Sequence, residues 1–138
     1  MAIGNDLVAA VLRSPLHGIL SGSVALVRYT GRRSGRTIVT PVQYVTIGED
    51  VVIVSARPET KTWWRNFTRE GDIEVLVRGT WRPLRARAVS GAEEPGTVQP
   101  LLEQYLHRFP RAAEALPGDT PEARTAAALV VWCRPRLS

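Results

Sequence analysis

Two short segments carry residue types suited to a ligand that has both an anionic part and a flat ring. The first, Thr30–Arg36, places arginines between two glycines. Glycine permits positive φ, so neighbouring N–H groups can converge on an anion while guanidinium groups fork onto phosphate oxygens. The second, Lys61–Phe67, offers adjacent tryptophans. The plain alternatives are a solvated hairpin turn and aromatic core packing.

Three aromatic residues are candidates for a ligand pocket. Trp63 and Phe67 are four residues apart and share one face of a short helix, which predicts that Trp63 faces the core. Trp64 then points about a hundred degrees away, with Arg65 and Asn66 as a polar rim. Tyr105 follows a polar segment on a predicted helix, so it either packs beneath that helix or closes over a pocket.

No familiar catalytic constellation occurs in the sequence. There is no Gly-x-Ser-x-Gly, no Cys–His couple and no Walker or dinucleotide glycine motif. The lone Cys133 is expected to be a buried small hydrophobe, and His17 and His107 lack partners at metal spacing, so we predict no metal site. An enzyme of this sequence would therefore need a cofactor to carry the chemistry.

The elements that must position these residues are mostly strands joined by hairpins. We expect a single domain over 1–138, with 1–22 as a helical segment that contains an apolar run, Leu7–Leu20, broken at Pro15. Further helices are expected at Trp63–Phe67, capped by Thr60 or Thr62, and at Val98–Leu116. Six strands are expected: Ser23–Tyr29, Thr37–Ile47 with Pro41 at an edge, bulge or split, Val51–Ser55, Asp72–Val77, Trp81–Val89 and Ala126–Trp132. This pattern predicts a small antiparallel barrel with flanking helices.

The formal net charge of +5 favours anionic partners, whether phosphorylated cofactors, nucleic acid or an anionic membrane surface. The arginines gather at two places, the turn Thr30–Arg36 and the second hairpin, which predicts two basic sites. The hairpin arginines are Arg78, Arg82, Arg85 and Arg87. The sequence has no apolar run of eighteen residues, and Asp6 and Arg13 argue against a secretory signal, so we expect a cytoplasmic protein.

Three motifs in this order resemble the deazaflavin-dependent nitroreductase, or F420H2-dependent quinone reductase, family. They are Tyr29–Gly35, Thr40–Val42 and Trp63–Phe67, and the resemblance is close over residues 16–89. It implies an antiparallel split β-barrel of the FMN-binding type, with coenzyme F420 as cofactor and FMN as the alternative. Reduced F420 would pass a hydride to a quinone, nitroaromatic or similar small-molecule acceptor.

The resemblance also implies which residues form the site. The cofactor tail would lie on Arg32, Arg33, Ser34 and Gly35, with Arg36 in support. The ring would lie along Pro41 and Val42, and Trp63, Trp64, Arg65 and Asn66 would border the pocket. The chain departs from the family pattern at Ile38, Gln43 and Ala56. Ala56 stands where the family pattern has a serine beside the ring, and the neighbouring Ser55 could supply that hydroxyl instead. Ser55 and Tyr105 are the catalytic candidates.

Two alternatives stay open beside the reductase. The barrel groove could hold a lipid or other amphiphile without catalysis, with Leu7–Leu20 resting on a membrane surface. Nucleic-acid binding through basic and aromatic residues would show a steep salt dependence, and it is the least favoured of the three. The oligomeric state is expected to be a monomer or a homodimer.

Overall fold

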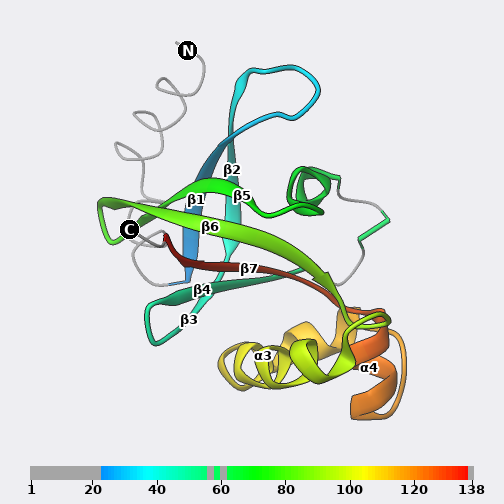
Figure 1. Cartoon of the computed structure of the whole chain (residues 1–138). Helices are drawn as coiled ribbons and strands as arrows, with labels where there is room; N and C mark the ends of the chain where they lie inside the picture. Colours follow the sequence, from blue (N-terminus) through cyan, green and yellow to red (C-terminus); the bar gives the residue numbers. More distant parts are fainter. Residues whose placement is uncertain (1–22, 56–57, 60–61, 137–138) are drawn as a thin grey trace.

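The structure, a computed structural model, describes residues 23–55, 58–59 and 62–136 (Figure 1). Its strands are β1 (Val24–Thr30), β2 (Thr37–Gln43), β3 (Val45–Ile47), β4 (Asp50–Ser55), β5 (Gly71–Val77), β6 (Thr80–Ser90) and β7 (Leu129–Pro135). Its helices are η1 (Trp63–Phe67), α3 (Pro95–Arg108), η2 (Pro110–Ala115) and α4 (Pro121–Ala127), of which η1 and η2 are 3₁₀-helices. The predicted helix within Leu7–Leu20 lies outside the described residues.

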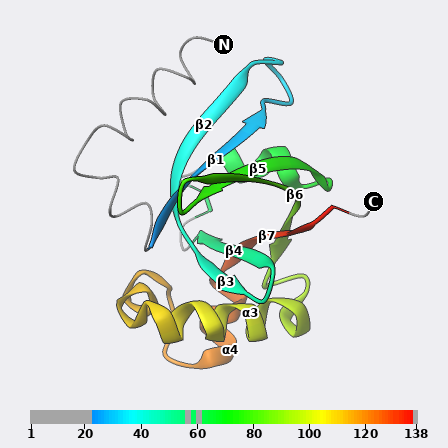
Figure 2. The same cartoon turned by 90° about the vertical axis from the view of Figure 1, so that its left-hand side faces the viewer.

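The seven strands form one antiparallel sheet that curls into a half-barrel. The strand order is β2-β1-β5-β6-β7-β4-β3, so β2 and β3 lie at opposite edges of the sheet. Only Tyr44 separates these two strands in the chain. The sheet must therefore curve until its edges approach each other, as Figure 2 shows. This architecture confirms the predicted antiparallel split β-barrel.

The strand β4, which lies between β7 and β3, carries apolar side chains that pack on both faces of the sheet. Val51 and Ile53 point into the barrel interior, where they join Val27, Val75 and Val131. Val52 points the other way, because successive side chains of a strand alternate between faces. It packs in a second cluster with Val98 and Leu102 of α3. The β-branched run of β4 is thus buried on both faces of the sheet.

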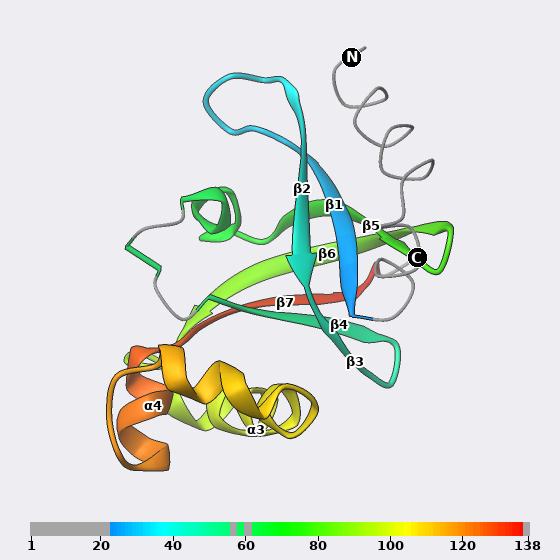
Figure 3. The same ribbon diagram turned by 180° about the vertical axis from the view of Figure 1, so that it is seen from behind.

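The two candidate binding segments lie at one end of the sheet, and the helices α3 and α4 lie at the other. Figure 3 shows the turn between β1 and β2 projecting at one end, with α3 and α4 packed at the other. The 3₁₀-helix η1 lies beside the projecting turn, because a hydrogen bond joins Arg32 to Asn66. The chain thus brings the two candidate binding segments together. No described helix is long and apolar enough to cross a membrane.

Three expected elements differ from the structure. The expected strand Thr37–Ile47 splits at Tyr44 into β2 and β3. Its Pro41 lies on β2, an edge strand of the sheet, where a residue without a backbone N–H is tolerated. The expected helix Val98–Leu116 begins earlier and ends at Arg108, because Pro110 starts the separate helix η2. Residues 121–127 form α4, which the sequence interpretation missed, so the last strand starts at Leu129 instead of Ala126.

Three of the four arginines of the second predicted basic site bond within the protein, and one of them, Arg82, donates to the Glu49 carbonyl at 2.7 Å. Arg85 bridges Glu70 and Asp72 at 3.1 Å each, and Asp72 lies directly opposite it in the β5–β6 register. Arg87 pairs with Glu94 at 2.9 Å. Arg85 and Arg87 are therefore neutralised by carboxylates, whereas Arg32, Arg33 and Arg36 of the turn between β1 and β2 take part in no ion pair between described residues.

Candidate functional site

The turn between β1 and β2 is held by its own backbone. The N–H of Gly31 donates to the Arg36 carbonyl at 2.8 Å, and the N–H of Gly35 donates to the Gly31 carbonyl at 2.9 Å. Gly35 has a φ of 68°, a left-handed conformation that favours glycine. A Cβ at Gly31 would lie 2.7 Å from Ser34 Oγ and 2.8 Å from Ile38 Cδ1, so a larger residue here would require these two side chains to shift. The N–H groups of Gly31 and Gly35 are therefore occupied. No hydrogen bond from the N–H of Arg33 or Ser34 is found among the described residues, so a backbone contribution to anion binding at this turn stays a prediction.

Cationic side chains of this turn and of η1 surround a small cavity and can bind an anion there. Arg32, Arg33 and Arg65 line a cavity of about 300 Å³, and none of the ion pairs between described residues engages them. The other lining residues are Gly31, Ser34, Ile38, Thr62 and Asn66. No carboxylate is among the described residues that line this cavity, so three guanidinium groups set the charge of this lining. Guanidinium forks suit phosphate or carboxylate oxygens.

Asn66 fixes the distance between the basic turn and η1. Its Oδ1 accepts a hydrogen bond from the backbone N–H of Arg32 at 2.8 Å. Its Nδ2 donates to the carbonyl of Trp63, also at 2.8 Å. Both ends of the side-chain amide are therefore used within the protein. Asn66 lines the basic cavity as expected, but its contacts make it a positioning residue.

The two tryptophans of η1 have different surroundings. Trp63 packs in an aromatic cluster, with its ring centroid 5.9 Å from Tyr29 and 6.0 Å from Phe67, which confirms that it faces inward. Trp64 is half-buried against the same core, and its indole N–H donates to the Pro58 carbonyl at 2.9 Å. Trp64 thus lines neither of the two cavities described in this section. The predicted side-chain cap of η1 is absent at Thr62.

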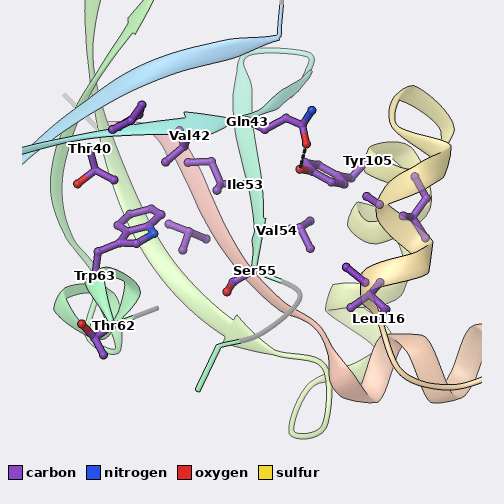
Figure 4. Close-up of a pocket in the computed structure, with 15 residues that line it drawn as sticks. Thr40, Val42, Gln43, Ile53, Val54, Ser55, Thr62, Trp63, Tyr105 and Leu116 are labelled. Carbon is purple, nitrogen blue, oxygen red and sulfur yellow. Dashed lines mark hydrogen bonds between the residues drawn. The ribbon is translucent and has the colours of Figure 1, made fainter. Parts of the chain in front are cut away.

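A larger cavity of about 640 Å³ opens next to the basic one (Figure 4). Its volume falls within the range typical of small-molecule sites. Strand residues form most of its wall, and Trp63 closes one side: Thr40, Pro41, Val42, Gln43, Ile53, Val54, Ser55, Thr62, Trp63 and Val131. The helical end contributes Tyr105, Leu106, Ala112, Ala115 and Leu116. Thr62 lines both cavities, so the basic and the apolar spaces adjoin.

Ser55 places an unpartnered hydroxyl in the wall of this larger cavity. The residue is only 9% exposed, and its Oγ has no hydrogen-bond partner among the described residues. A buried polar atom without a partner costs free energy, and native structures leave few of them. Figure 4 shows Ser55 at the end of β4, on the cavity side facing Trp63 and Thr62. A ligand with a polar edge would supply the missing partner.

Tyr105 and Gln43 join the helical end of the cavity to the barrel. The Tyr105 hydroxyl donates to Gln43 Oε1 at 3.0 Å (Figure 4). The Tyr105 ring is buried, and this burial raises the pKa of its phenol to about 12. Tyr105 therefore forms a fixed wall of the cavity and keeps its proton at neutral pH. The structure favours the packed alternative over the lid for this residue.

Most of the residues singled out from the sequence line one of the two cavities. Arg32, Arg33, Ser34, Arg65 and Asn66 line the basic one. Pro41, Val42, Gln43, Ser55, Trp63 and Tyr105 line the larger one. Gly35, Arg36 and Trp64 line neither, and Ala56 lies outside the described residues.

The sequence interpretation missed the helical end of the larger cavity. Ala112 and Ala115 belong to η2, where residues three apart lie on the same face. Nothing in the local sequence separates these alanines from ordinary helix formers. Thr40 and Thr62 were also missed as lining residues, although Thr40 belongs to one recognised motif and Thr62 directly precedes another.

Three comparisons agree with this arrangement. The sequence model of a family described as F420H(2)-dependent quinone reductase matches residues 12–112. A Mycobacterium tuberculosis protein named as a candidate F420H(2)-dependent quinone reductase is 30% identical over 71 residues, which cover 49% of this chain. The match spans 60% of that relative's length.

Two solved structures share the fold. One, described as a domain-swapped dimer, has a TM-score of 0.62 at 16% identity and covers 96% of both chains. The other, an F420-H2 dependent reductase, has a TM-score of 0.61 at 17% identity and covers 82% of this chain and 95% of its own. At these identities the likeness concerns the fold alone.

Proposed function

Since the chain belongs to the F420H2-dependent quinone reductase family, we propose that it reduces a quinone, nitroaromatic or similar activated acceptor with coenzyme F420. One observation carries the proposal. A cavity lined by three free guanidinium groups adjoins a larger, mainly apolar cavity whose wall holds an unpartnered hydroxyl. A ligand with an anionic tail and a planar ring with a polar edge matches both spaces at once.

The basic cavity would hold the tail through side chains. Arg32, Arg33 and Arg65 supply charge, while the N–H groups of Gly31 and Gly35 bond within the turn. Charge-assisted hydrogen bonds from guanidinium to phosphate are about twice as strong as neutral ones. This supports an anionic tail over a neutral one. Gly35 and Arg36 would act by shaping the turn, since they line neither cavity.

The larger cavity would hold the ring and, beside it, the acceptor. Pro41 and Val42 offer a wall from the edge strand, and Trp63 offers an aromatic surface. The Ser55 hydroxyl can donate to a ring carbonyl or accept from a ring N–H. Its lack of a protein partner supports the fit of a deazaflavin, whose ring has such an edge.

Reduced F420, when bound, supplies a hydride. The residues of the chain orient the two reactants and keep bulk water from their contact, which converts an encounter into a positioned reaction. Burial raises the pKa of the Tyr105 phenol to about 12, so this residue keeps its proton at neutral pH and would form a hydrogen-bonding wall. The proton that completes reduction of the acceptor would come from solvent.

Binding of an amphiphile without catalysis is the second candidate, and one observation favours it. The helical end of the larger cavity is lined by Leu106, Ala112, Ala115 and Leu116, which offer hydrocarbon surface and the space left by two short side chains. An acyl chain would suit this end. The proposed contact of Leu7–Leu20 with a membrane surface lies outside the described residues.

Oxidation of F420H2 by menadione in the presence of the purified protein separates these functions. The reductase proposal requires protein-dependent recovery of F420 absorbance, which saturates with menadione and falls in Arg33→Ala. Native mass spectrometry of the same sample would reveal a bound amphiphile. A co-purified acyl ligand together with no F420H2 oxidation would reject the reductase in favour of the second candidate. Sedimentation of the sample tests whether the chain forms a homodimer.

A further inference from the structure

The pair formed by Gln43 and Tyr105 has hydrogen-bonding capacity that the fold does not use. The two side chains meet at 3.0 Å, and both line the larger cavity. Gln43 Nε2 has no partner in the hydrogen bonds found between described residues, and Gln43 is exposed. The Tyr105 oxygen donates its single proton to Gln43 and keeps its lone pairs. Donor and acceptor groups thus lie side by side on the cavity wall.

This pattern is independent of how the Gln43 amide is turned. With Oε1 toward Tyr105, the free groups are the amide N–H of Gln43 and the lone pairs of the Tyr105 oxygen. With the amide reversed, they are the Gln43 oxygen and the Tyr105 O–H. In either case one donor and one acceptor remain. The pair matches a ligand edge on which an acceptor and a donor are also neighbours.

The bond between the two residues is not needed to keep Tyr105 in place. The Tyr105 ring is 4% exposed, and its centroid lies 5.1 Å from that of Phe109. The Gln43 amide is exposed, so a ligand in the cavity can contact it directly. These features suit a recognition group on a rigid wall, since a fixed hydrogen-bonding surface discriminates better than a mobile one.

We propose that Gln43 and Tyr105 select an acceptor whose carbonyl oxygen lies next to an N–H or O–H donor, as in an amino-substituted quinone. The inference rests on the proposed function, because it assigns the acceptor class of the same site. A carbonyl beside a methyl group would leave one member of the pair without a partner. Sites built to hydrogen-bond a ligand reject analogues that lack the matching group.

Two quinones of nearly equal size test the proposal. In 2-amino-1,4-naphthoquinone an NH2 group lies beside the carbonyl, and in 2-methyl-1,4-naphthoquinone a CH3 group replaces it. Isothermal titration calorimetry of the protein without F420 gives a Kd for each. We expect the aminoquinone to bind roughly threefold to tenfold more tightly, the range of one net hydrogen bond. Gln43→Leu and Tyr105→Phe should each reduce this preference toward one.

Two further variants are compared with the wild type by the ratio of the two Kd values. Gln104→Leu makes the same substitution at an exposed position of α3 outside the cavity, so it should keep the wild-type ratio. Gln43→Glu removes the amide donor at similar size and should also lower the ratio.

The proposal is overturned by equal Kd values in the wild type, by failure of both quinones to bind, or by an unchanged ratio in Gln43→Leu. Selective binding without any F420H2 oxidation would reject the proposed function and the role of the pair in selecting an acceptor, and it would leave only the preference of the pair for this kind of ligand edge.

Discussion

The side chain of Asn66 accepts a hydrogen bond from the backbone N–H of Arg32 at 2.8 Å, although 34 positions separate them in the chain. The same amide donates to the carbonyl of Trp63. One side chain therefore sets the position of the basic turn relative to the aromatic wall of the larger cavity. A ligand that spans both cavities requires that this distance be fixed before binding.

Replacing Asn66 by Ala should weaken F420 binding more than it destabilises the fold. The variant leaves the Arg32 N–H without its partner and lets the turn move relative to η1, at a cost of about 1–2 kcal/mol in binding. Titration with F420 measures the loss. Thr68→Ala is the control, because Thr68 bonds to the Arg65 carbonyl at the end of η1 without reaching the turn. Equal losses in both variants would contradict the positioning role.

Arg33→Ala should weaken F420 binding by about 1.5–3 kcal/mol through loss of a charge-assisted contact to the tail. Arg69→Ala removes the same charge from an exposed residue near η1 that lines neither cavity, and it should change the affinity little. The wild-type affinity should also fall as salt is raised, and this dependence should be weaker in Arg33→Ala. A folded Arg33→Ala protein with unchanged affinity would move the tail site elsewhere.

Ser55→Ala should separate stability from binding. The substitution removes a buried hydroxyl that has no described partner, so thermal stability should stay level or rise by up to about 1 kcal/mol. F420 binding should weaken, because the ring edge loses its partner. Differential scanning fluorimetry and titration measure the two effects on one sample. A clear loss of stability together with wild-type affinity would show that Ser55 serves the fold.

Stability should fall at alkaline pH as Cys133 titrates. Burial, with a smaller effect from the charge of Asp50, raises the pKa of this thiol from 9.0 to about 12. Above pH 9 the unfolded chain loses the thiol proton while the folded chain keeps it, so folding loses up to about 1.4 kcal/mol per pH unit until pH 12. Urea unfolding of wild type and Cys133→Ala at pH 8 to 11 compares the slopes. Parallel curves would contradict a buried, protonated thiol.

The sequence predicted the parts of the fold that depend on local pattern. The first strand, the β-branched run in β4 and the tight β5–β6 hairpin all appear in the structure. The basic cavity could also be predicted in part from the sequence, since two of its arginines, Arg32 and Arg33, lie in one turn. The residues of α4 had a helix signal that was overlooked: Thr120 caps Ala123, with Pro121 at the first helical position.

The remaining features depend on contacts between distant parts of the chain. The pairing of Arg85 with Asp72 follows from strand register, which a turn-centred interpretation does not fix. The occupied N–H group of Arg32 could not be known from the sequence, because its partner is the distant Asn66. The unpartnered Ser55 hydroxyl and the alanine-lined end of the cavity exist only once β4 and η2 face the same space.

The central claim is that this chain binds F420 across the two adjoining cavities. Titration of the purified protein with F420, followed by tryptophan fluorescence, tests it most directly, because Trp63 lines the ring cavity. FMN serves as the parallel ligand. We predict saturable quenching at micromolar F420 and much weaker quenching by FMN. No response to F420, or an equal response to FMN, would contradict the assignment.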